Sequence, residues 1–306
     1  MRIVIDLQGA QTVYFLRDIS RTALELSQAI VRNQGDHEVH IALNGSFQDT
    51  IEPIRAAFSG LIEQKNIHIW TAPGPVRECD PRNTLRREVA ELIREAYLAS
   101  LKPDIIYLSS LFDGFVDEAV TSIGEHTIGI PTIVMLDDLI PLLNREAYLL
   151  PNPSFEQHYL RKVSHLQRVD AYLISLAPTE VQGTVALDLE HSVVTNPSEA
   201  CSQIFQKIKV ERVNELTVRQ QFGLTKPFAM YFGGYEILKN LSSLIHAYAR
   251  LPIVIRSDHQ LAIVGQLSAD HRDKLRTLAG ECDLHKADVI FRLCHRPRLS
   301  HAIQLS

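Results

Sequence analysis

One pattern, an apolar run followed by a glycine turn and an amphipathic stretch, occurs twice in this chain and restricts its fold more than any other feature. The first copy is MRIVIDLQGAQ at residues 1–11, and the second is PFAMYFGGYEILKNL at residues 227–241. Strand, glycine turn and helix in this order are typical of the opening of a parallel sheet of the nucleotide-binding type. Two such openings predict two α/β domains.

Apolar segments of strand length recur along the chain and alternate with helical patterns. The expected strands of the first domain are residues 2–7, 38–43, 66–70, 105–108, 132–136, 171–175 and 192–194. Those of the second domain are residues 228–232, 260–264 and 288–291. Apolar positions at helical spacing predict helices at residues 21–33, 83–101, 240–251 and 269–282. The alternation favours parallel sheets covered by helices.

The alternation breaks between residues 196 and 216, where Pro197 and the charged stretch KIKVERVNEL interrupt the apolar pattern. We therefore expect an N-terminal domain at residues 1–205 and a second domain at residues 206–306. A length of 306 residues and a hydrophobic content of 45% suffice for two packed cores.

Composition restricts the partners and the compartment. The net charge is -5, from 31 basic and 36 acidic side chains without a long block of one sign, which argues against nucleic acid as a partner. Four scattered cysteines favour reduced thiols. We find no signal peptide at the start and no window near the ~18 apolar residues of a membrane helix. We expect a cytoplasmic protein, with peripheral membrane contact left open.

Two glycine turns have the surroundings of an anion site, because the free N–H groups and the dipole of a helix N-terminus attract negative charge. In the first turn, Gly9 is followed by Arg17 and Arg21. If this segment is helical, the two guanidinium groups lie one turn apart and can hold charged oxygens.

The second turn contains Gly233 and Gly234 and is followed by Lys239 and Asn240. Neither turn has the glycine spacing of a dinucleotide-binding fingerprint or of a P-loop. The alternative for both is an ordinary strand-to-helix turn with basic residues on the surface.

Asp137 and Asp138 close the predicted strand in TIVMLDDLIPL. Ligands of open α/β sheets gather at the carboxyl ends of strands, so these carboxylates are candidates to bind a sugar hydroxyl or a metal, or to act as a base. The alternative is that Asp138 caps the following helix and Asp137 is solvated.

Four segments of the chain are shared with a known family of enzymes: MRIVIDLQGAQ at the start, and residues 72–115, 129–144 and 222–252. Together they resemble glycosyltransferase family 4, the retaining sugar transferases of the GT-B fold, and especially its bacterial mannosyltransferase-like members. The resemblance implies an α/β, GT-B-like fold of two Rossmann-like domains. It places the acceptor mainly on the first domain and the donor on the second.

The function that the resemblance implies is transfer of a hexose, with mannose favoured, from a nucleotide sugar to a glycan or lipid-linked acceptor in polysaccharide biosynthesis. No metal or other cofactor is expected. Basic side chains and helix N-termini would stabilise the departing diphosphate and the oxocarbenium-like sugar instead.

The resemblance assigns Gly9, Arg17 and Arg21 to the first phosphate-binding loop of the family. Asp18 and Ser20 stand where the family has glycines. The lost glycines limit close approach of the backbone to phosphate, and Asp18 adds a negative charge beside a negative ligand.

Two further assignments depart from the family in the same way. Asp138 matches the aspartate of a His-Asp pair, but Asp137 replaces the histidine. Lys239 matches the lysine that contacts the donor phosphate, whereas Leu238 replaces its basic neighbour. Each departure removes a group that would favour the donor.

The family continues beyond the strand at residues 288–291 into a segment with a glutamate pair that holds the donor ribose and sugar. We expect this segment to be missing and the second domain to be incomplete. Two functions remain: an active hexosyltransferase, or a catalytically impaired remnant or non-catalytic binding subunit. An unrelated two-domain α/β binding protein is a third.

Overall fold

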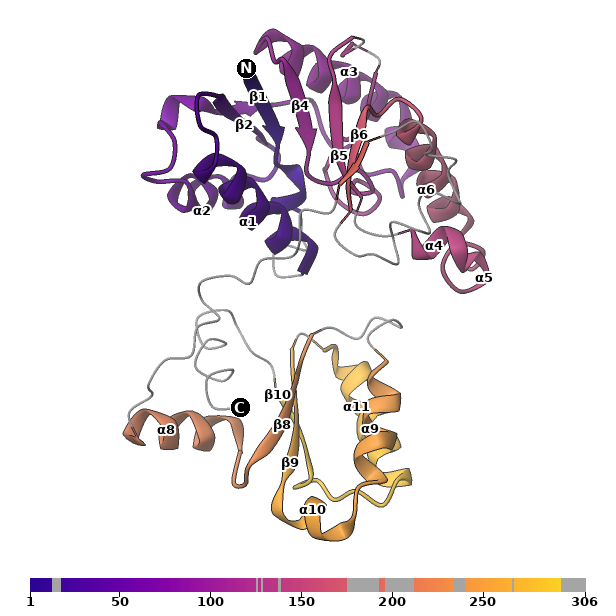
Figure 1. Cartoon of the computed structure of the whole chain (residues 1–306). Coiled ribbons are helices and arrows are strands. Elements are labelled where there is room, and N and C mark those ends of the chain that lie inside the picture. Colours follow the sequence, from indigo (N-terminus) through magenta and orange to yellow (C-terminus); the bar gives the residue numbers. More distant parts are fainter. Residues whose placement is uncertain are drawn as a thin grey trace. The chain divides into compact units, whose positions relative to one another are not determined.

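The computed structural model of this chain describes residues 1–12, 18–124, 126–127, 129–136, 139–174, 193–195, 212–233, 240–265 and 267–292 (Figure 1). Its internal contacts divide the chain into two compact units, Met1–Ala200 and Cys201–Ser306. The boundary that the sequence predicts at residues 205 and 206 falls outside the described residues and stays a prediction.

The first unit is built on a parallel sheet of seven strands in the order β3-β2-β1-β4-β5-β6-β7. They are β1 (Arg2–Asp6), β2 (Glu38–Asn44), β3 (Ile67–Trp70), β4 (Ile105–Leu108), β5 (Thr132–Leu136), β6 (Ala171–Ile174) and β7 (Val193–Thr195). The central strands read as short apolar runs such as IIYL and TIVML because a doubly covered parallel sheet buries both faces of each strand.

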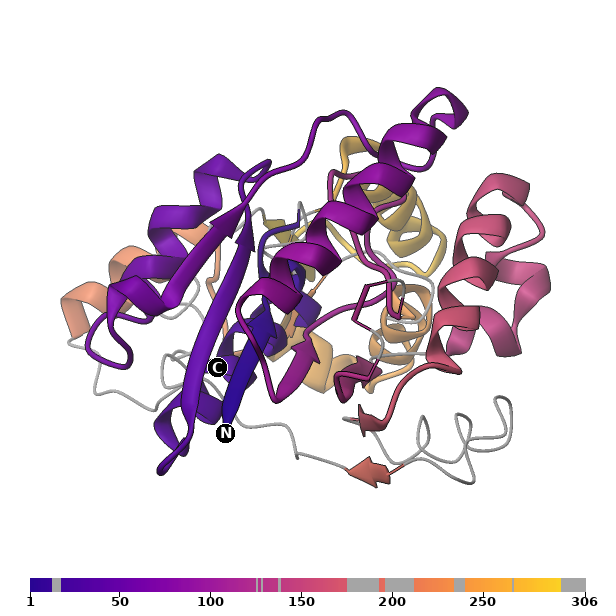
Figure 2. The same cartoon turned by 90° about the horizontal axis from the view of Figure 1, so that it is seen from above.

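Helices cover both faces of this sheet (Figure 2). The longer helices are α1 (Asp18–Arg32), α2 (Gln48–Ala57), α3 (Thr84–Ser100) and α6 (Pro153–Leu166). The short ones are η1 (Gln8–Ala10), η3 (Gln64–Asn66), η4 (Pro81–Asn83), α4 (Ile140–Leu143) and α5 (Arg145–Tyr148). Helices α1 and α2 pack on the face that carries Ile5 and Ile41. Helices α3 and α6 pack on the opposite face, through Val4, Ile106 and Val134.

The second unit contains a parallel sheet of three strands in the order β10-β9-β8. The strands are β8 (Phe228–Phe232), β9 (Gln260–Val264) and β10 (Val289–Arg292), and the helices are α8 (Arg212–Phe222), α9 (Leu241–Ala249), α10 (Ile253–Asp258) and α11 (Ala269–Glu281). Helices α9 and α11 cover one face through Ile245 and Leu275, which pack against Ile263. Phe222 and Leu224 cover the other face at Ala262 and Val264.

The fold class and the positions of the strands confirm the sequence-based predictions. One correction concerns the charged stretch assigned to the linker, whose last residues begin α8 at Arg212. Among the described side chains of this helix, Phe222 at its end packs on the sheet. Arg219 reinforces that contact, since its guanidinium carbon lies 5.5 Å from the ring centre of Phe228. Within the described part of the chain, every helix is too short or too polar to span a bilayer.

Candidate active site

The topology of the first sheet points to the carboxyl ends of the neighbouring strands β1 and β4 as a candidate site. The chain runs outward from β1 to β2 and β3, then returns to the other side of β1 at β4. The strand order therefore reverses between β1 and β4, and open α/β sheets bind ligands outside the carboxyl ends of the strands at such a switch point. All strands are parallel, so these ends share one edge.

Gly9 lies at this switch point, in the η1 turn that follows β1. A Cβ atom built on Gly9 would lie 2.8 Å from the Cβ of Ser110 and 3.1 Å from the Oγ of Ser109. The Ser109 hydroxyl in turn donates to the carbonyl oxygen of Asp6 at 2.7 Å. A glycine is therefore required here so that the connections after β1 and β4 can pack against each other. Its predicted contact with phosphate stays a prediction.

Gln8 links the same turn to the long connection between β4 and β5. Its Nε2 donates to the carbonyl oxygen of Val120 at 2.7 Å, and the Val120 N–H donates back to Oε1 at 3.0 Å. The Nδ2 of Asn44, at the end of β2, also donates to Oε1 at 2.9 Å. The side chain of Gln8 thus pairs with the backbone as a neighbouring strand would, and fixes this connection over the carboxyl edge.

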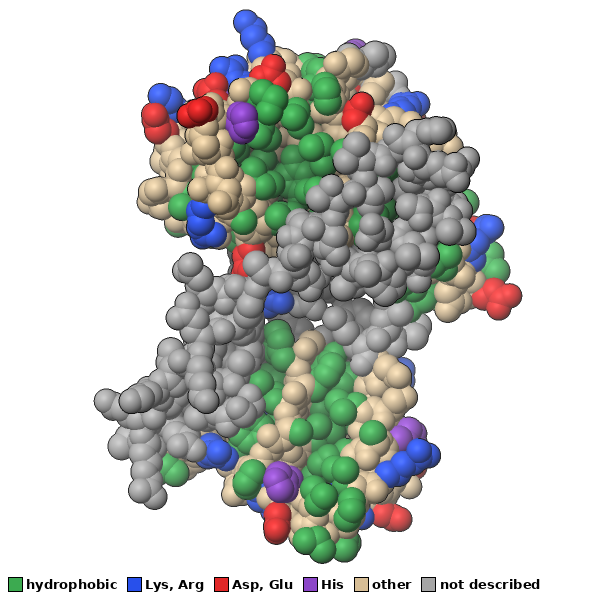
Figure 3. All heavy atoms as spheres, viewed as in Figure 1, with side chains coloured by type: hydrophobic (Ala, Val, Ile, Leu, Met, Phe, Trp, Pro, Cys, Tyr) green, Lys and Arg blue, Asp and Glu red, His purple; other side chains and the backbone are tan. Residues whose placement is uncertain are grey.

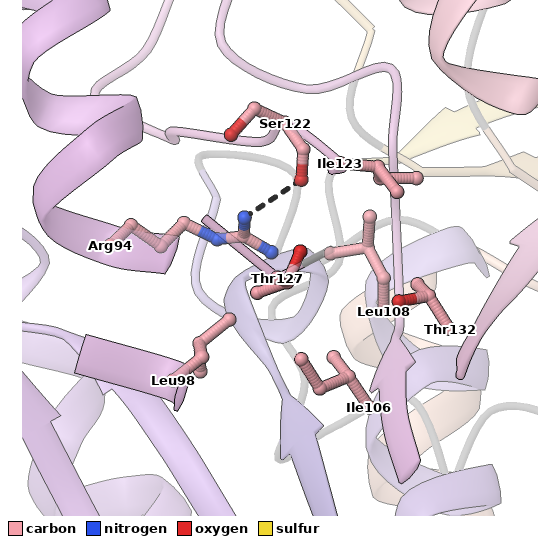
Figure 4. A pocket seen from close by; sticks show the side chains of 8 residues that line it. All are labelled: Arg94, Leu98, Ile106, Leu108, Ser122, Ile123, Thr127 and Thr132. Atoms are coloured by element: carbon pink, nitrogen blue, oxygen red, sulfur yellow. Dashed lines mark hydrogen bonds between the residues drawn. The ribbon is translucent and has the colours of Figure 1, made fainter. Parts of the chain in front are cut away.

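Asp6 and Arg94 form an ion pair inside the first unit, with 2.5 Å between Arg94 Nε and Asp6 Oδ2. Arg94 also donates to the carbonyl oxygen of Ser122 at 2.9 Å (Figure 4). A cavity of about 10 Å³ adjoins Arg94 and Thr132, which is room for about one water molecule. This pair therefore positions the connection and does not present a ligand site.

Asp113 lies in the connection that follows β4 and carries a titratable carboxyl. Burial and the nearby Asp117 raise the pKa of Asp113 to about 7, against the opposing effect of a hydrogen bond from Ser110. Its Oδ2 is buried and has no hydrogen-bond partner among the described residues.

Lys162 reaches into the same region from α6. Burial and the neighbouring Arg161 lower the pKa of Lys162 to about 7. Its Nζ donates to the carbonyl oxygen of Thr121 and, at 2.5 Å, to the Thr121 hydroxyl. Asp113 and Lys162 therefore both change protonation near neutral pH, a property that is common in catalytic sites.

Glu78 lies in the connection between β3 and α3 and bonds to α6. Burial alone would raise the pKa of Glu78, but hydrogen bonds from His158 and Arg161 hold it well below its usual range. The two contacts are 2.7 Å to His158 Nδ1 and 2.5 Å to an Arg161 terminal nitrogen. Phe112 stacks on Tyr159 beside them, with 4.7 Å between ring centres. The aromatic contact holds α6 against the connection after β4, and the charged contacts hold it against the connection after β3.

Several predicted site residues lie outside the described residues: Arg17, Asp137, Asp138, Gly234 and Lys239. Their roles stay predictions. Arg21 is described and lies in the first turns of α1, where it is half-buried.

Gly233 directly follows β8 and donates its N–H to the carbonyl oxygen of Val264 at 3.1 Å. A Cβ atom on Gly265, which follows β9, would lie only 1.9 Å from the carbonyl oxygen of Gly233. The carboxyl ends of β8 and β9 therefore need glycine at Gly265. Asn240 precedes α9 in the left-handed region, with φ at 48°, and its side chain makes no capping hydrogen bond.

Sequence reasoning missed Ser109, Ser110, Asp113 and Lys162. A signal for the first three was present in the sequence: polar residues directly follow a predicted strand. SSLFD follows the strand IIYL in the same way that DD follows the strand TIVML. Lys162 gave none, since its position on α6 reads as an ordinary surface lysine. Among the described residues no group of three His, Cys, Asp or Glu side chains is arranged to hold a metal ion.

Two curated proteins of known activity are similar to this chain in sequence. The serotype-specific mannosyltransferase WbdA of Escherichia coli is 29% identical over 293 residues, which is 95% of this chain and 35% of that protein. A second WbdA of Escherichia coli is 28% identical over 87% of this chain and 33% of its own length. No family model matches the sequence.

Solved structures agree with this relationship at the level of the fold. HepE of Anabaena, in complex with UDP and glucose, has a TM-score of 0.60 at 12% identity and covers 99% of this chain and 72% of its own. WaaG, a glycosyltransferase of lipopolysaccharide biosynthesis, has a TM-score of 0.57 at 12% identity, with the same two coverages. The chain has the GT-B fold of these structures and is similar in sequence to the mannosyltransferase WbdA. It spans about a third of the length of the curated relatives it matches.

Proposed function

We propose that this chain transfers a hexose, with mannose favoured, from a nucleotide sugar to a glycan or lipid-linked acceptor. The observation that carries the proposal is the similarity to WbdA, a mannosyltransferase, along 95% of the chain. The GT-B fold shared with HepE, which was solved in complex with UDP-glucose, supports a nucleotide sugar as the donor.

In this proposal the acceptor binds at the switch point of the first unit. The connections after β1 and β4 meet there at Gly9 and Ser110, and Asp113 supplies a carboxyl that can accept a proton near neutral pH. Asp138, with Asp137 beside it, would lie after β5 on the same edge and act on the reacting sugar or hydroxyl.

The donor diphosphate would bind to basic side chains beside the glycine turns. Arg17 and Arg21 take this role in the first unit, and Lys239 takes it in the second, between Gly233 and the start of α9. Because these cations and the helix N-termini can neutralise a departing diphosphate, the proposal includes no metal cofactor. A cytoplasmic location also remains part of the proposal.

Calorimetric titration with a panel of UDP- and GDP-sugars tests the donor site. We expect saturable binding that Lys239→Ala weakens and Lys274→Ala does not. Lys274 is a matched control because its side chain is exposed on α11, where it pairs with Asp270 at 2.7 Å. A thermal shift gives an independent readout, since ligand at 100 times Kd stabilises a protein by about 2.7 kcal/mol.

Product analysis then separates the two functions that the sequence left open. Release of nucleotide diphosphate in the presence of an acceptor, lost in Lys239→Ala, supports transfer. Donor binding without turnover across the acceptor panel supports a non-catalytic binding subunit. Absence of both binding and turnover at millimolar donor would overturn the proposal.

A further inference from the structure

Helix α10 presents a group of apolar side chains to the solvent. Ile253 and Val254 are 72% and 70% exposed, and Ile255 and Leu251 are 43% and 37% exposed. Figure 3 shows hydrophobic side chains gathered at the end of the second unit where Figure 1 labels α10. We call these four residues the α10 surface. Adjacent large apolar side chains on a surface mark a contact with a protein, a membrane or a ligand.

Hydrogen bonds hold the α10 surface in place. The Tyr248 hydroxyl donates to the carbonyl oxygen of His259 at 3.0 Å, and the Nε of Arg256 donates to the carbonyl oxygen of Leu251 at 3.2 Å. The Ile255 N–H donates to the carbonyl oxygen of Pro252 at 2.9 Å. The outward direction of the apolar side chains is therefore built into the fold, and a partner need not order them first.

Basic residues lie in the segments next to the α10 surface. Gln260 begins β9 and bonds to both neighbouring segments: its Oε1 accepts from the Lys226 N–H at 3.1 Å, and its Nε2 donates to the carbonyl oxygen of Ala287 at 2.8 Å. These bonds bring Lys226 and Lys286 to the edge where Arg250 and Arg256 flank α10.

Cations outnumber carboxylates in the segments at this edge. The four cations are Lys226, Arg250, Arg256 and Lys286, and within the described residues none of them forms an ion pair. Three carboxylates lie in the same segments: Asp258, Asp283 and Asp288. An apolar centre with a basic rim complements an anionic lipid surface, because apolar side chains enter the acyl boundary and cations meet the phosphates.

We propose that the α10 surface and its basic rim bind the interface of a bilayer that contains anionic phospholipid. The surface lies at the amino ends of β8, β9 and β10, whereas Gly233 and Gly265 lie at the carboxyl ends of their strands. Contact with a membrane would therefore leave the carboxyl edge of this sheet open. The inference concerns a surface remote from the proposed donor site and does not depend on sugar transfer.

Co-sedimentation of the full chain with vesicles tests the proposal. The vesicles are pure phosphatidylcholine, or phosphatidylcholine mixed with phosphatidylglycerol. We expect binding to the mixed vesicles, weaker by about tenfold or more in Ile253→Ser/Val254→Ser, because each buried CH₂ adds substantially to interfacial affinity. Leu216→Ser is the matched control, since Leu216 is 60% exposed on α8 of the same unit, and it should bind like the unaltered chain.

The basic rim has its own test. Arg250→Gln and Lys286→Gln should each weaken binding to the mixed vesicles about fivefold, which corresponds to about 1 kcal/mol per cation near an anionic surface. Binding should also fall as salt is raised from about 0.1 M to 1 M, where screening shortens the reach of surface charges. Arg256 is left unaltered because it holds the helix in place.

Three results would overturn the proposal: equal binding to neutral and mixed vesicles, unchanged binding of Ile253→Ser/Val254→Ser, or no vesicle binding together with self-association that this variant abolishes. The last result would assign the α10 surface to a second copy of the chain. Circular dichroism on the same samples reports folding, and calorimetry with nucleotide sugars reports donor binding, so failure here is distinct from failure of the proposed function.

Discussion

Replacing Arg94 with methionine tests whether its ion pair with Asp6 fixes the centre of the first unit. Arg94 is 1% exposed and Asp6 is fully buried, with 2.5 Å between the paired atoms. Arg94 also donates to the carbonyl oxygen of Ser122. Methionine fills much of the same volume without a charge, so Arg94→Met leaves Asp6 as a buried carboxylate without its counter-charge.

The expected loss of stability follows from the groups that remain around Asp6. Removing one partner of a buried ion pair costs about 3–5 kcal/mol. Gln8 still donates to Asp6 through its N–H at 3.3 Å and its Nε2 at 3.1 Å, so we expect the lower end of that range. In Asp6→Asn/Arg94→Met both charges are gone, and we expect a favourable coupling of about 1–3 kcal/mol relative to the sum of the single variants.

Tryptophan fluorescence during urea unfolding measures this change in the first unit alone. Trp70 is the only tryptophan of the chain and is buried at the end of β3. Arg82→Met is the control, because Arg82 pairs with Asp80 at 2.7 Å but its side chain is 87% exposed, and we expect no measurable change. A midpoint for Arg94→Met equal to that of Arg82→Met would refute the reasoning.

Three further predictions concern the connections at the switch point. Gly9→Ala should cost about 1–3 kcal/mol in the same assay, because its methyl carbon would lie 2.8 Å from the Cβ of Ser110, and Ser110→Gly should restore part of the loss. The raised pKa of Asp113 favours the folded state only while the carboxyl is protonated, so the unaltered chain should lose stability as pH rises from about 4 to about 7. In Asp113→Asn this pH dependence should be absent. The lowered pKa of Lys162 means that the unfolded chain binds one more proton than the folded chain between about pH 7 and pH 10, so the unaltered chain should gain stability as pH rises through this range. In Lys162→Met this gain should be absent. Urea midpoints at several pH values check both, and identical pH profiles for variant and unaltered chain would contradict them.

The strands could be predicted from the sequence because their signal is local. A strand buried on both faces, such as β4 or β5, is apolar along most of its length. Helices α2 and α6 gave no such signal. Helix α2 contains Pro53, and α6 buries His158 and Lys162 on the face that periodicity would require to be apolar.

The candidate site was predictable only where one segment carries the information. Gly9 was found from its place after a strand, although its contact with Ser110 shows a packing reason for the glycine. The pairing of Asp6 with Arg94 joins positions far apart in sequence, and no local pattern announces it. The same holds for Lys162, whose partner Thr121 lies in the connection between β4 and β5.

Buried polar side chains are unevenly distributed between the two units. In the first unit they gather where Gln8, Arg94 and Lys162 hold the connection between β4 and β5 at the carboxyl edge. In the second unit Gln260 is the one buried polar residue within the described part of the chain. A buried polar side chain is costly unless it forms hydrogen bonds, and those bonds are satisfied in only one arrangement of the surrounding segments. Such side chains therefore specify the local geometry.

Gln260 holds the amino edge of the second sheet, the edge of the α10 surface. In Gln260→Leu the Lys226 N–H and the Ala287 carbonyl oxygen lose their partner, so the basic rim should loosen while the apolar packing around Ile263 persists. We therefore expect Gln260→Leu to weaken vesicle binding and to leave nucleotide-sugar binding unchanged, since Gly233 and Gly265 lie at the other ends of the strands. Equal loss of both activities would mean that Gln260 acts through the stability of the whole unit and not through this edge.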